Sequence, residues 1–161
     1  MLFLAPTIDV SLLTRLPSKP FAHQIERGIQ LKDFQQLNVF VVDDEPIIAH
    51  TLGSVLRVRG FAATSFVNPF KALERTQTVT PDLIITDVLM PQMSGIDLAI
   101  KVKELCPNCK VLLCSGQAET VDLLSAAQAR GYDFDVLSKP VHPTDLLFKL
   151  HSLAVTPHPV S

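Results

Sequence analysis

The sequence of 161 residues contains no tryptophan, one tyrosine and no cluster of lysine or arginine. With a net charge of −2, it lacks the basic surface expected of a nucleic-acid-binding domain. No apolar stretch is long enough to cross a bilayer, and the apolar first five residues are not preceded by the basic residues of an export signal. We therefore expect a cytoplasmic protein that binds neither DNA nor a membrane.

Cysteine is also scarce, and its odd count of three favours reduced thiols over disulfides. Cys106 and Cys109 have the spacing of a redox or zinc half-site, but zinc needs two further ligands, and no second pair follows at a suitable spacing. We favour a structural interpretation for this pair and a buried strand position for Cys114. His50 and His142 have no companion ligand and are predicted to be surface or packing residues.

Hydrophobic patterning divides the chain into three parts. Residues 1–37 carry three prolines and irregularly spaced apolar residues, which indicates an N-terminal extension with room for one short helix over about 20–36. Residues 38–154 are regular and predict one domain. Residues 155–161, with two prolines, are predicted to be a frayed tail.

Within residues 38–154, short apolar runs alternate with amphipathic segments. The runs predict strands at 39–42, 61–66, 83–87, 111–114 and 134–137. The amphipathic segments predict five helices. They start near Pro46, near Pro69, after a turn at Gly95 and near Glu119, and the last one lies around Leu146 to Leu153. This alternation predicts an α/β fold with a five-stranded parallel sheet, doubly wound with helices on both faces.

Chemically active side chains stand where the predicted strands end. Asp43 and Asp44 follow the first strand, Asp87 ends the third, Ser115 follows the fourth and Lys139 follows the fifth. In an open parallel sheet these ends meet at one edge. Three crowded carboxylates repel one another unless a cation joins them, and Mg²⁺ prefers such oxygen ligands. A carboxylate beside Mg²⁺ can attack phosphorus, and hydroxyl and ammonium groups suit the phosphoryl oxygens.

Four segments carry a family resemblance over residues 38–154. They are Val41-Val42-Asp43-Asp44-Glu45, Ile85-Thr86-Asp87-Val88-Leu89-Met90-Pro91-Gln92-Met93-Ser94-Gly95, Cys114-Ser115-Gly116 and Leu137-Ser138-Lys139-Pro140. Together they resemble the receiver domain of response regulators in two-component signalling, in particular stand-alone, chemotaxis-regulator-like receivers. The resemblance implies a flavodoxin-like sheet of order 2-1-3-4-5 and a cis Lys139-Pro140 bond.

The resemblance also implies the residues of the site. Asp87 would accept a phosphoryl group from a sensor histidine kinase or a phosphotransfer protein, in a reaction assisted by Ser115 and Lys139. Asp43, Asp44, Asp87 and the backbone carbonyl of Leu89 would hold Mg²⁺. Because the chain ends soon after the predicted domain, we expect output through contacts with a downstream protein effector rather than through a DNA-binding domain.

One position departs from the family pattern. Three residues before the lysine the family usually has Phe or Tyr, which turns inward on activation, whereas this chain has Val136. A short, stiff side chain cannot make that movement, so we expect weak coupling to residues 119–154 and more signalling through residues 88–95.

Two other classes of protein compete with the receiver interpretation. An aspartate-nucleophile Mg²⁺ phosphatase would carry a second Asp two residues after the nucleophile, where this chain has Leu89. A pseudo-receiver with a dead site would usually lack an acidic-pair residue or the lysine, and this sequence retains Asp43, Asp44 and Lys139. Both alternatives are therefore disfavoured.

Overall fold

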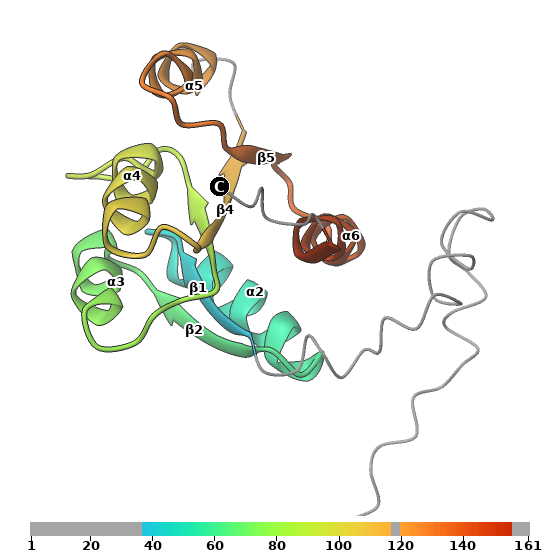
Figure 1. The fold of residues 1–161 in the computed structure, drawn as a ribbon. Coiled ribbons are helices and arrows are strands. Elements are labelled where there is room, and N and C mark those ends of the chain that lie inside the picture. The colour runs from blue at the N-terminus through green and yellow to red at the C-terminus, as the bar shows by residue number, and fades with distance from the viewer. Residues whose placement is uncertain (1–36, 117–119, 156–161) are drawn as a thin grey trace, which may run out of the picture. The chain divides into compact units, whose positions relative to one another are not determined.

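The computed structural model describes residues 37–116 and 120–155, and the helix suggested for residues 20–36 lies outside these ranges. In the described part, strands and helices alternate (Figure 1). The elements are β1 (Asn38–Val42), α2 (Pro46–Val58), β2 (Ala62–Phe66), α3 (Pro69–Thr76), β3 (Leu83–Asp87), α4 (Gly95–Leu105), β4 (Lys110–Ser115), α5 (Thr120–Ala129), β5 (Asp135–Ser138) and α6 (Pro143–Val155).

The five strands form one parallel sheet in the order β2-β1-β3-β4-β5, which confirms the predicted fold. Val42 pairs with Thr86, and Asp87 pairs with Cys114. Strands β1, β3 and β4 therefore end at a common edge of the sheet, and the residues that follow them are brought together there.

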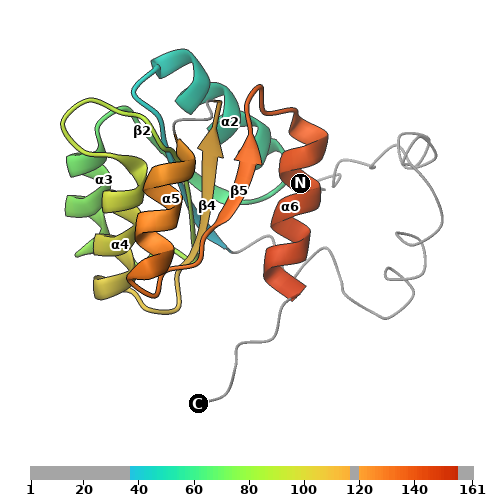
Figure 2. The same ribbon diagram turned by 90° about the horizontal axis from the view of Figure 1, so that it is seen from above.

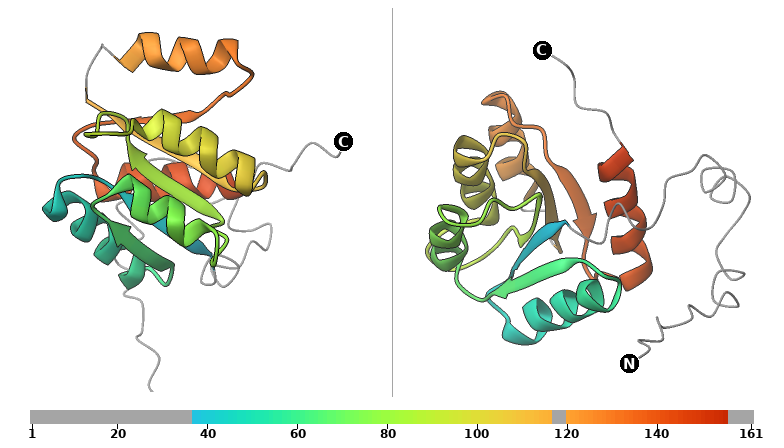
Figure 3. Two further views of the ribbon diagram at one scale, coloured as in Figure 1. Left: turned by 90° about the vertical axis from the view of Figure 1, so that its left-hand side faces the viewer. Right: turned by 60° about the horizontal axis from the view of Figure 1, so that its bottom comes forward.

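Helices cover both faces of the sheet (Figures 2 and 3). Helices α3, α4 and α5 enclose a core cluster that includes Phe40, Ile84 and Leu113. Helices α2 and α6 enclose a second cluster that includes Val39, Ile85 and Leu112. Because alternate residues of a strand face opposite sides, strands covered on both sides need continuous apolar runs, and β1, β3 and β4 have them. None of the helices in the described ranges is long and apolar enough to cross a membrane.

Local sequence signals explain where several elements begin and end. Proline occupies the first position of α2 and α3, where the missing amide hydrogen is not needed. The Asn68 side chain accepts a hydrogen bond from the Phe70 amide and caps α3. Gly60, with φ of 92°, follows the end of α2. These boundaries lie within one residue or two of the predicted ones.

Strand β5 differs from its prediction by one residue at each end. It spans Asp135–Ser138 rather than 134–137, because it is aligned by its ladder with β4, in which Ser115 pairs with Ser138. Strand β4 likewise extends from Lys110 to Ser115, one residue beyond the predicted run at each end. Pairing with the neighbouring strands sets the ends of β4 and β5, and the apolar runs in the sequence do not show where that pairing stops.

Candidate functional site

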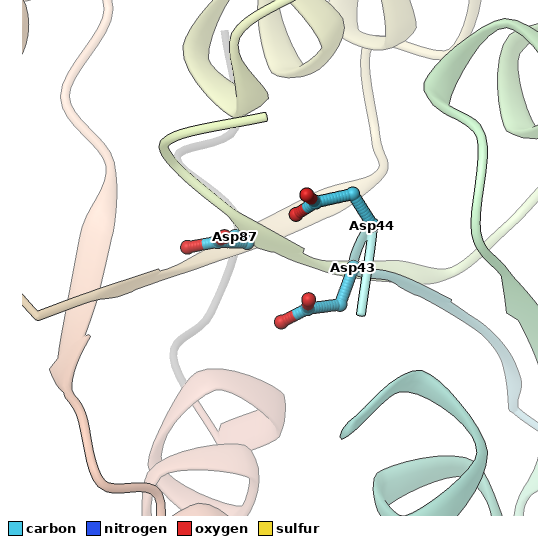
Figure 4. A group of neighbouring side chains, drawn as sticks. All are labelled: Asp43, Asp44 and Asp87. Carbon is cyan, nitrogen blue, oxygen red and sulfur yellow. The ribbon is translucent and has the colours of Figure 1, made fainter. Parts of the chain in front are cut away.

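Three carboxylates meet at the carboxyl edge of the sheet. Asp43 and Asp44 follow β1 and Asp87 is the last residue of β3, and their oxygens lie within 4.8 Å of one another. Asp43 is buried, whereas Asp44 and Asp87 are partly exposed. Figure 4 shows the three side chains directed into the same space. The structure thus brings together the three acidic residues that the sequence placed at strand ends.

Lys139 reaches this cluster from the end of β5. Its Nζ lies 3.0 Å from Asp43 Oδ2 and 3.2 Å from Asp87 Oδ1, so one ammonium bridges two of the carboxylates. The backbone amide of Lys139 donates to the carbonyl of Ser115 over 2.8 Å, which ties the lysine to the end of β4. The Lys139-Pro140 peptide bond is cis, as the resemblance implied.

The electrostatics of the cluster favour an additional cation. Burial raises the pKa of Asp87, and the Asp43 and Asp44 charges add to this, while Lys139 opposes it. Burial works against the charge of Lys139, but hydrogen bonding and attraction to Asp43 and Asp87 outweigh it and raise its pKa. Three carboxylates and one ammonium leave an excess of negative charge. An all-oxygen donor set with that excess fits a hard divalent ion such as Mg²⁺.

Ser115 ends β4 at the same edge, and its side chain is buried. Its Oγ lies 2.6 Å from Oγ1 of Thr120, the first residue of α5, and either hydroxyl can be the donor. Sequence reasoning found Ser115 from its strand end but missed Thr120. No spacing signal could have found Thr120, because the contact depends on where α5 begins in space.

Leu89, the expected source of a backbone ligand, lies two residues after Asp87 in the connection from β3 to α4. Leu89 is 42% exposed, so packing in the core does not account for an apolar residue at this position. The connection folds back on the strand, because the Gly95 amide donates to the Val88 carbonyl over 2.9 Å. This hydrogen bond closes the loop beside Asp87.

Gly95 is the first residue of α4, not a turn residue before the helix as the sequence suggested. A Cβ at this position would lie 1.9 Å from the carbonyl oxygen of Asp87, so only glycine fits. We expect Gly95→Ala to lower the free energy of unfolding by about 1–3 kcal/mol, because the backbone that carries Asp87 must shift. Urea unfolding would measure this loss.

The matched control is Gly116→Ala, in the next strand-end loop. A Cβ on Gly116 would lie 3.5 Å from the Lys139 Cβ, which is an ordinary contact. We expect this variant to change stability by less than about 0.5 kcal/mol. Equal losses in the two variants would contradict the steric explanation.

Gln92, in the same connection, has a φ of 71°, a left-handed conformation that costs a non-glycine residue about 1 kcal/mol. Its side chain is exposed, so little packing would be lost on truncation. We expect Gln92→Gly to raise the free energy of unfolding by about 0.5 kcal/mol or more, since relief of strain exceeds the added chain entropy. Gln128→Gly, within helix α5, should instead destabilise the protein. A loss of stability in both variants would refute the argument.

The remaining predictions on cysteine and histidine concern packing. All three cysteines are free and buried, and Cys106 and Cys109 pack in the core at the start of β4. Burial raises the pKa of Cys109 and of Cys114 to about 12, which keeps both thiols protonated at neutral pH. Within the described ranges, the acidic cluster is the one group suited to a metal, and neither His50 nor His142 belongs to it. The structural interpretation of the cysteine pair is supported.

Fold and site together define a doubly wound α/β protein with an acidic centre at the carboxyl edge of its sheet. A family model described as the response regulator receiver domain matches residues 39–151. The chain belongs to the response regulator receiver family. Receivers are signalling domains of two-component systems, and the family accepts phosphoryl groups on aspartate.

Curated relatives of two sizes resemble the chain. It is 28% identical to the chemotaxis protein CheY of Thermotoga maritima and 31% identical to the receiver protein CpdR of Brucella abortus, covering 72–73% of this chain and 96% of each relative. It is also 31% identical to the probable transcriptional regulatory protein TcrX of Mycobacterium tuberculosis, over 75% of this chain. The chain spans only about half of that relative, 51% of its length.

Solved structures show the same fold. A receiver domain from Clostridium thermocellum has a TM-score of 0.65 at 26% identity, and it covers 73% of this chain and 93% of its own. The response regulator TrrA from Thermotoga maritima, solved in complex with Mg²⁺ and a beryllium fluoride, has a TM-score of 0.63 at 26% identity and covers 73% of this chain and 98% of its own.

Proposed function

We propose that this receiver accepts a phosphoryl group on Asp87 from a sensor histidine kinase or a phosphotransfer protein, in a Mg²⁺-dependent reaction. The observation that carries the proposal is the convergence of Asp43, Asp44 and Asp87, with the Lys139 ammonium bridging two of them. A metal-binding carboxylate cluster with an inward-facing lysine is suited to phosphoryl transfer, which depends on positioning and charge neutralisation.

Each residue has a distinct chemical task in this proposal. A carboxylate oxygen of Asp87 attacks phosphorus while the bond from phosphorus to the donor imidazole nitrogen breaks, and the imidazole keeps the electron pair. Lys139, already 3.2 Å from Asp87, would shift to a phosphoryl oxygen and neutralise it. Ser115 would donate its hydroxyl hydrogen to another oxygen. Asp43, Asp44, Asp87 and the Leu89 carbonyl would hold Mg²⁺, which would supply further neutralisation of charge.

The alternatives fit the site less well. The apolar and partly exposed side chain of Leu89 occupies the position in which an aspartate phosphatase would need its general acid. A pseudo-receiver would not need a lysine that contacts both Asp43 and Asp87. We therefore infer a signalling domain that assists its own phosphorylation and dephosphorylation rather than a dedicated enzyme.

The proposal extends to the organisation and partners of the chain. We assign the receiver to residues 38–154, an N-terminal extension to residues 1–37 and a C-terminal tail to residues 155–161; of these, residues 1–36 and 156–161 lie outside the described ranges. The net charge of −2 supports a downstream protein effector rather than direct DNA binding. The free cysteines suit a reducing cytoplasm, in which kinases of this signalling type phosphorylate their partners.

The test is phosphorylation of the full chain by acetyl phosphate, followed by intact mass spectrometry. We expect the mass of one phosphoryl group to be gained with Mg²⁺, and the gain to be lost when EDTA removes the metal. A gain of equal size in EDTA would refute the metal-dependent mechanism. No gain with Mg²⁺, from either acetyl phosphate or phosphoramidate, would refute phosphoryl acceptance.

A further inference from the structure

Two buried hydroxyl groups join the edge of the sheet to helix α5. Ser115 Oγ and Thr120 Oγ1 lie 2.6 Å apart, and the residues are only 9% and 3% exposed. This separation lies at the short end of the range for hydroxyl–hydroxyl hydrogen bonds. Ser115 ends β4 beside the acidic cluster, whereas Thr120 begins α5. The pair is therefore a direct contact between the site and the helix.

Helix α5 buries few side chains. Of its ten residues only Thr120 and Ala127 are buried. Val121 is 59% exposed and Leu123 is 39% exposed. An element with little buried apolar surface is more easily displaced than a core helix such as α4, six of whose eleven residues are buried. A contact at the start of α5 can therefore influence its placement.

Strand β5 places a short, partly exposed side chain on the face of the sheet that α5 covers. Val136 pairs with Leu113 of β4, and paired residues of neighbouring strands point to the same face of the sheet. Leu113 belongs to the core cluster beneath α3, α4 and α5, so Val136 lies on that face. It is 36% exposed, and its short β-branched side chain cannot sweep toward Ser115 as an aromatic ring would.

We propose that Thr120 is a positioning residue that couples Ser115 to helix α5. The inference rests on the proposed function, in which the Ser115 hydroxyl turns to donate to a phosphoryl oxygen on Asp87. A serine hydroxyl has one hydrogen to donate and two lone pairs to accept with, so Ser115 can donate to the phosphoryl group while it accepts from Thr120.

The movement of Ser115 is thereby transmitted to the first turn of α5. Thr120 must follow Ser115 for the hydrogen bond to persist, and the two bonds in series polarise and strengthen each other. The hydroxyl of Thr120 thus takes over part of the task that the aromatic residue has in the family.

The test is hydrogen exchange of the full chain with and without Mg²⁺ and beryllofluoride, a phosphoryl analogue. In the wild type we expect altered exchange in residues 88–95 and in residues 120–129. Thr120→Val keeps the shape of the side chain but lacks the hydroxyl. In this variant residues 88–95 should show the same change in exchange as in the wild type. The change in exchange of α5 should fall by about two- to tenfold, because that factor corresponds to the free energy of one hydrogen bond.

Thr120→Ser is the conservative control, because it restores the hydroxyl and should restore the response of α5. Thr120→Ala provides a second hydroxyl-free variant if valine disturbs packing. Suppose that the change in hydrogen exchange of α5 is as large in both hydroxyl-free variants as in the wild type, and that residues 88–95 respond normally. This result would overturn the coupling through Thr120 but leave the proposed function standing. A wild type that responds in 88–95 but not in α5 would also overturn it. No response anywhere in the wild type would overturn the proposed function, and this inference with it.

Discussion

Replacing Asp87 with Asn should abolish the gain of a phosphoryl group from acetyl phosphate in the presence of Mg²⁺. The carboxylate is the proposed nucleophile, and a neutral amide cannot replace it in attack on phosphorus. Intact mass spectrometry of the wild type and the variant, at equal times and donor concentrations, would measure the effect. We expect the phosphorylated fraction of Asp87→Asn to fall to the background of the assay.

Asp82→Asn is the matched control, since Asp82 directly precedes the same strand at its other end. Its exposed carboxylate accepts a hydrogen bond from the Asn38 amide, which the oxygen of an asparagine side chain can also accept. This variant should be phosphorylated like the wild type. A phosphoryl gain that persists in Asp87→Asn, or is lost in both variants, would contradict the assignment of Asp87.

The loss in Asp87→Asn should not be a consequence of unfolding. In the metal-free protein, burial and the acidic neighbours raise the pKa of Asp87 despite Lys139. A carboxyl group whose pKa is raised on folding costs stability once pH rises above its unfolded pKa, and the neutral amide lacks this cost. We therefore expect the metal-free variant at neutral pH to unfold at a urea concentration no lower than that of the wild type.

The second large effect should follow Asp44→Asn, which removes one anionic group from the proposed Mg²⁺ site. We expect the dissociation constant for Mg²⁺ to rise by about tenfold to a hundredfold, allowing for solvent screening of a partly exposed charge. Isothermal titration calorimetry would give the Mg²⁺ dissociation constants of the wild type and of Asp44→Asn under the same conditions.

Glu45→Gln is the control for this measurement. Glu45 is the next acidic residue along the chain, but its side chain is exposed and lies outside the group of three carboxylates. Its loss should weaken Mg²⁺ binding far less than the loss of Asp44. If the two variants lose affinity equally, net charge rather than ligation controls the binding, and Asp44 is not a ligand.

Much of the site could be predicted because its parts are encoded locally. Each strand is a short run of residues, and the residue at its carboxyl end is read directly from the sequence. The parallel topology then requires those ends to meet, so the sequence predicts that Asp43, Asp44, Asp87 and Lys139 lie together. The structure confirms this convergence.

Other features depend on the three-dimensional environment of single residues. The need for glycine at position 95 follows from the approach of α4 to the Asp87 carbonyl, and the sequence showed only a glycine near a turn. The left-handed conformation of Gln92 is likewise invisible in the sequence, because glutamine carries no signal for it. Both features arise because the connection from β3 to α4 must fold back beside Asp87.

The amino-acid sequence was sufficient for the class of fold, the order of the elements and the chemical groups at the edge of the sheet, since hydrophobic period and strand-end residues are local properties. Tertiary structure decided how Ser115 is held, because the hydroxyl of Thr120 meets it only after α5 has been placed against the sheet. It also decided how little of α5 is buried, with Val136 on the same side of the sheet. Such contacts are set by the packing of whole helices and strands. The spacing of residues along the chain does not show that two hydroxyl groups will point toward each other in the folded protein.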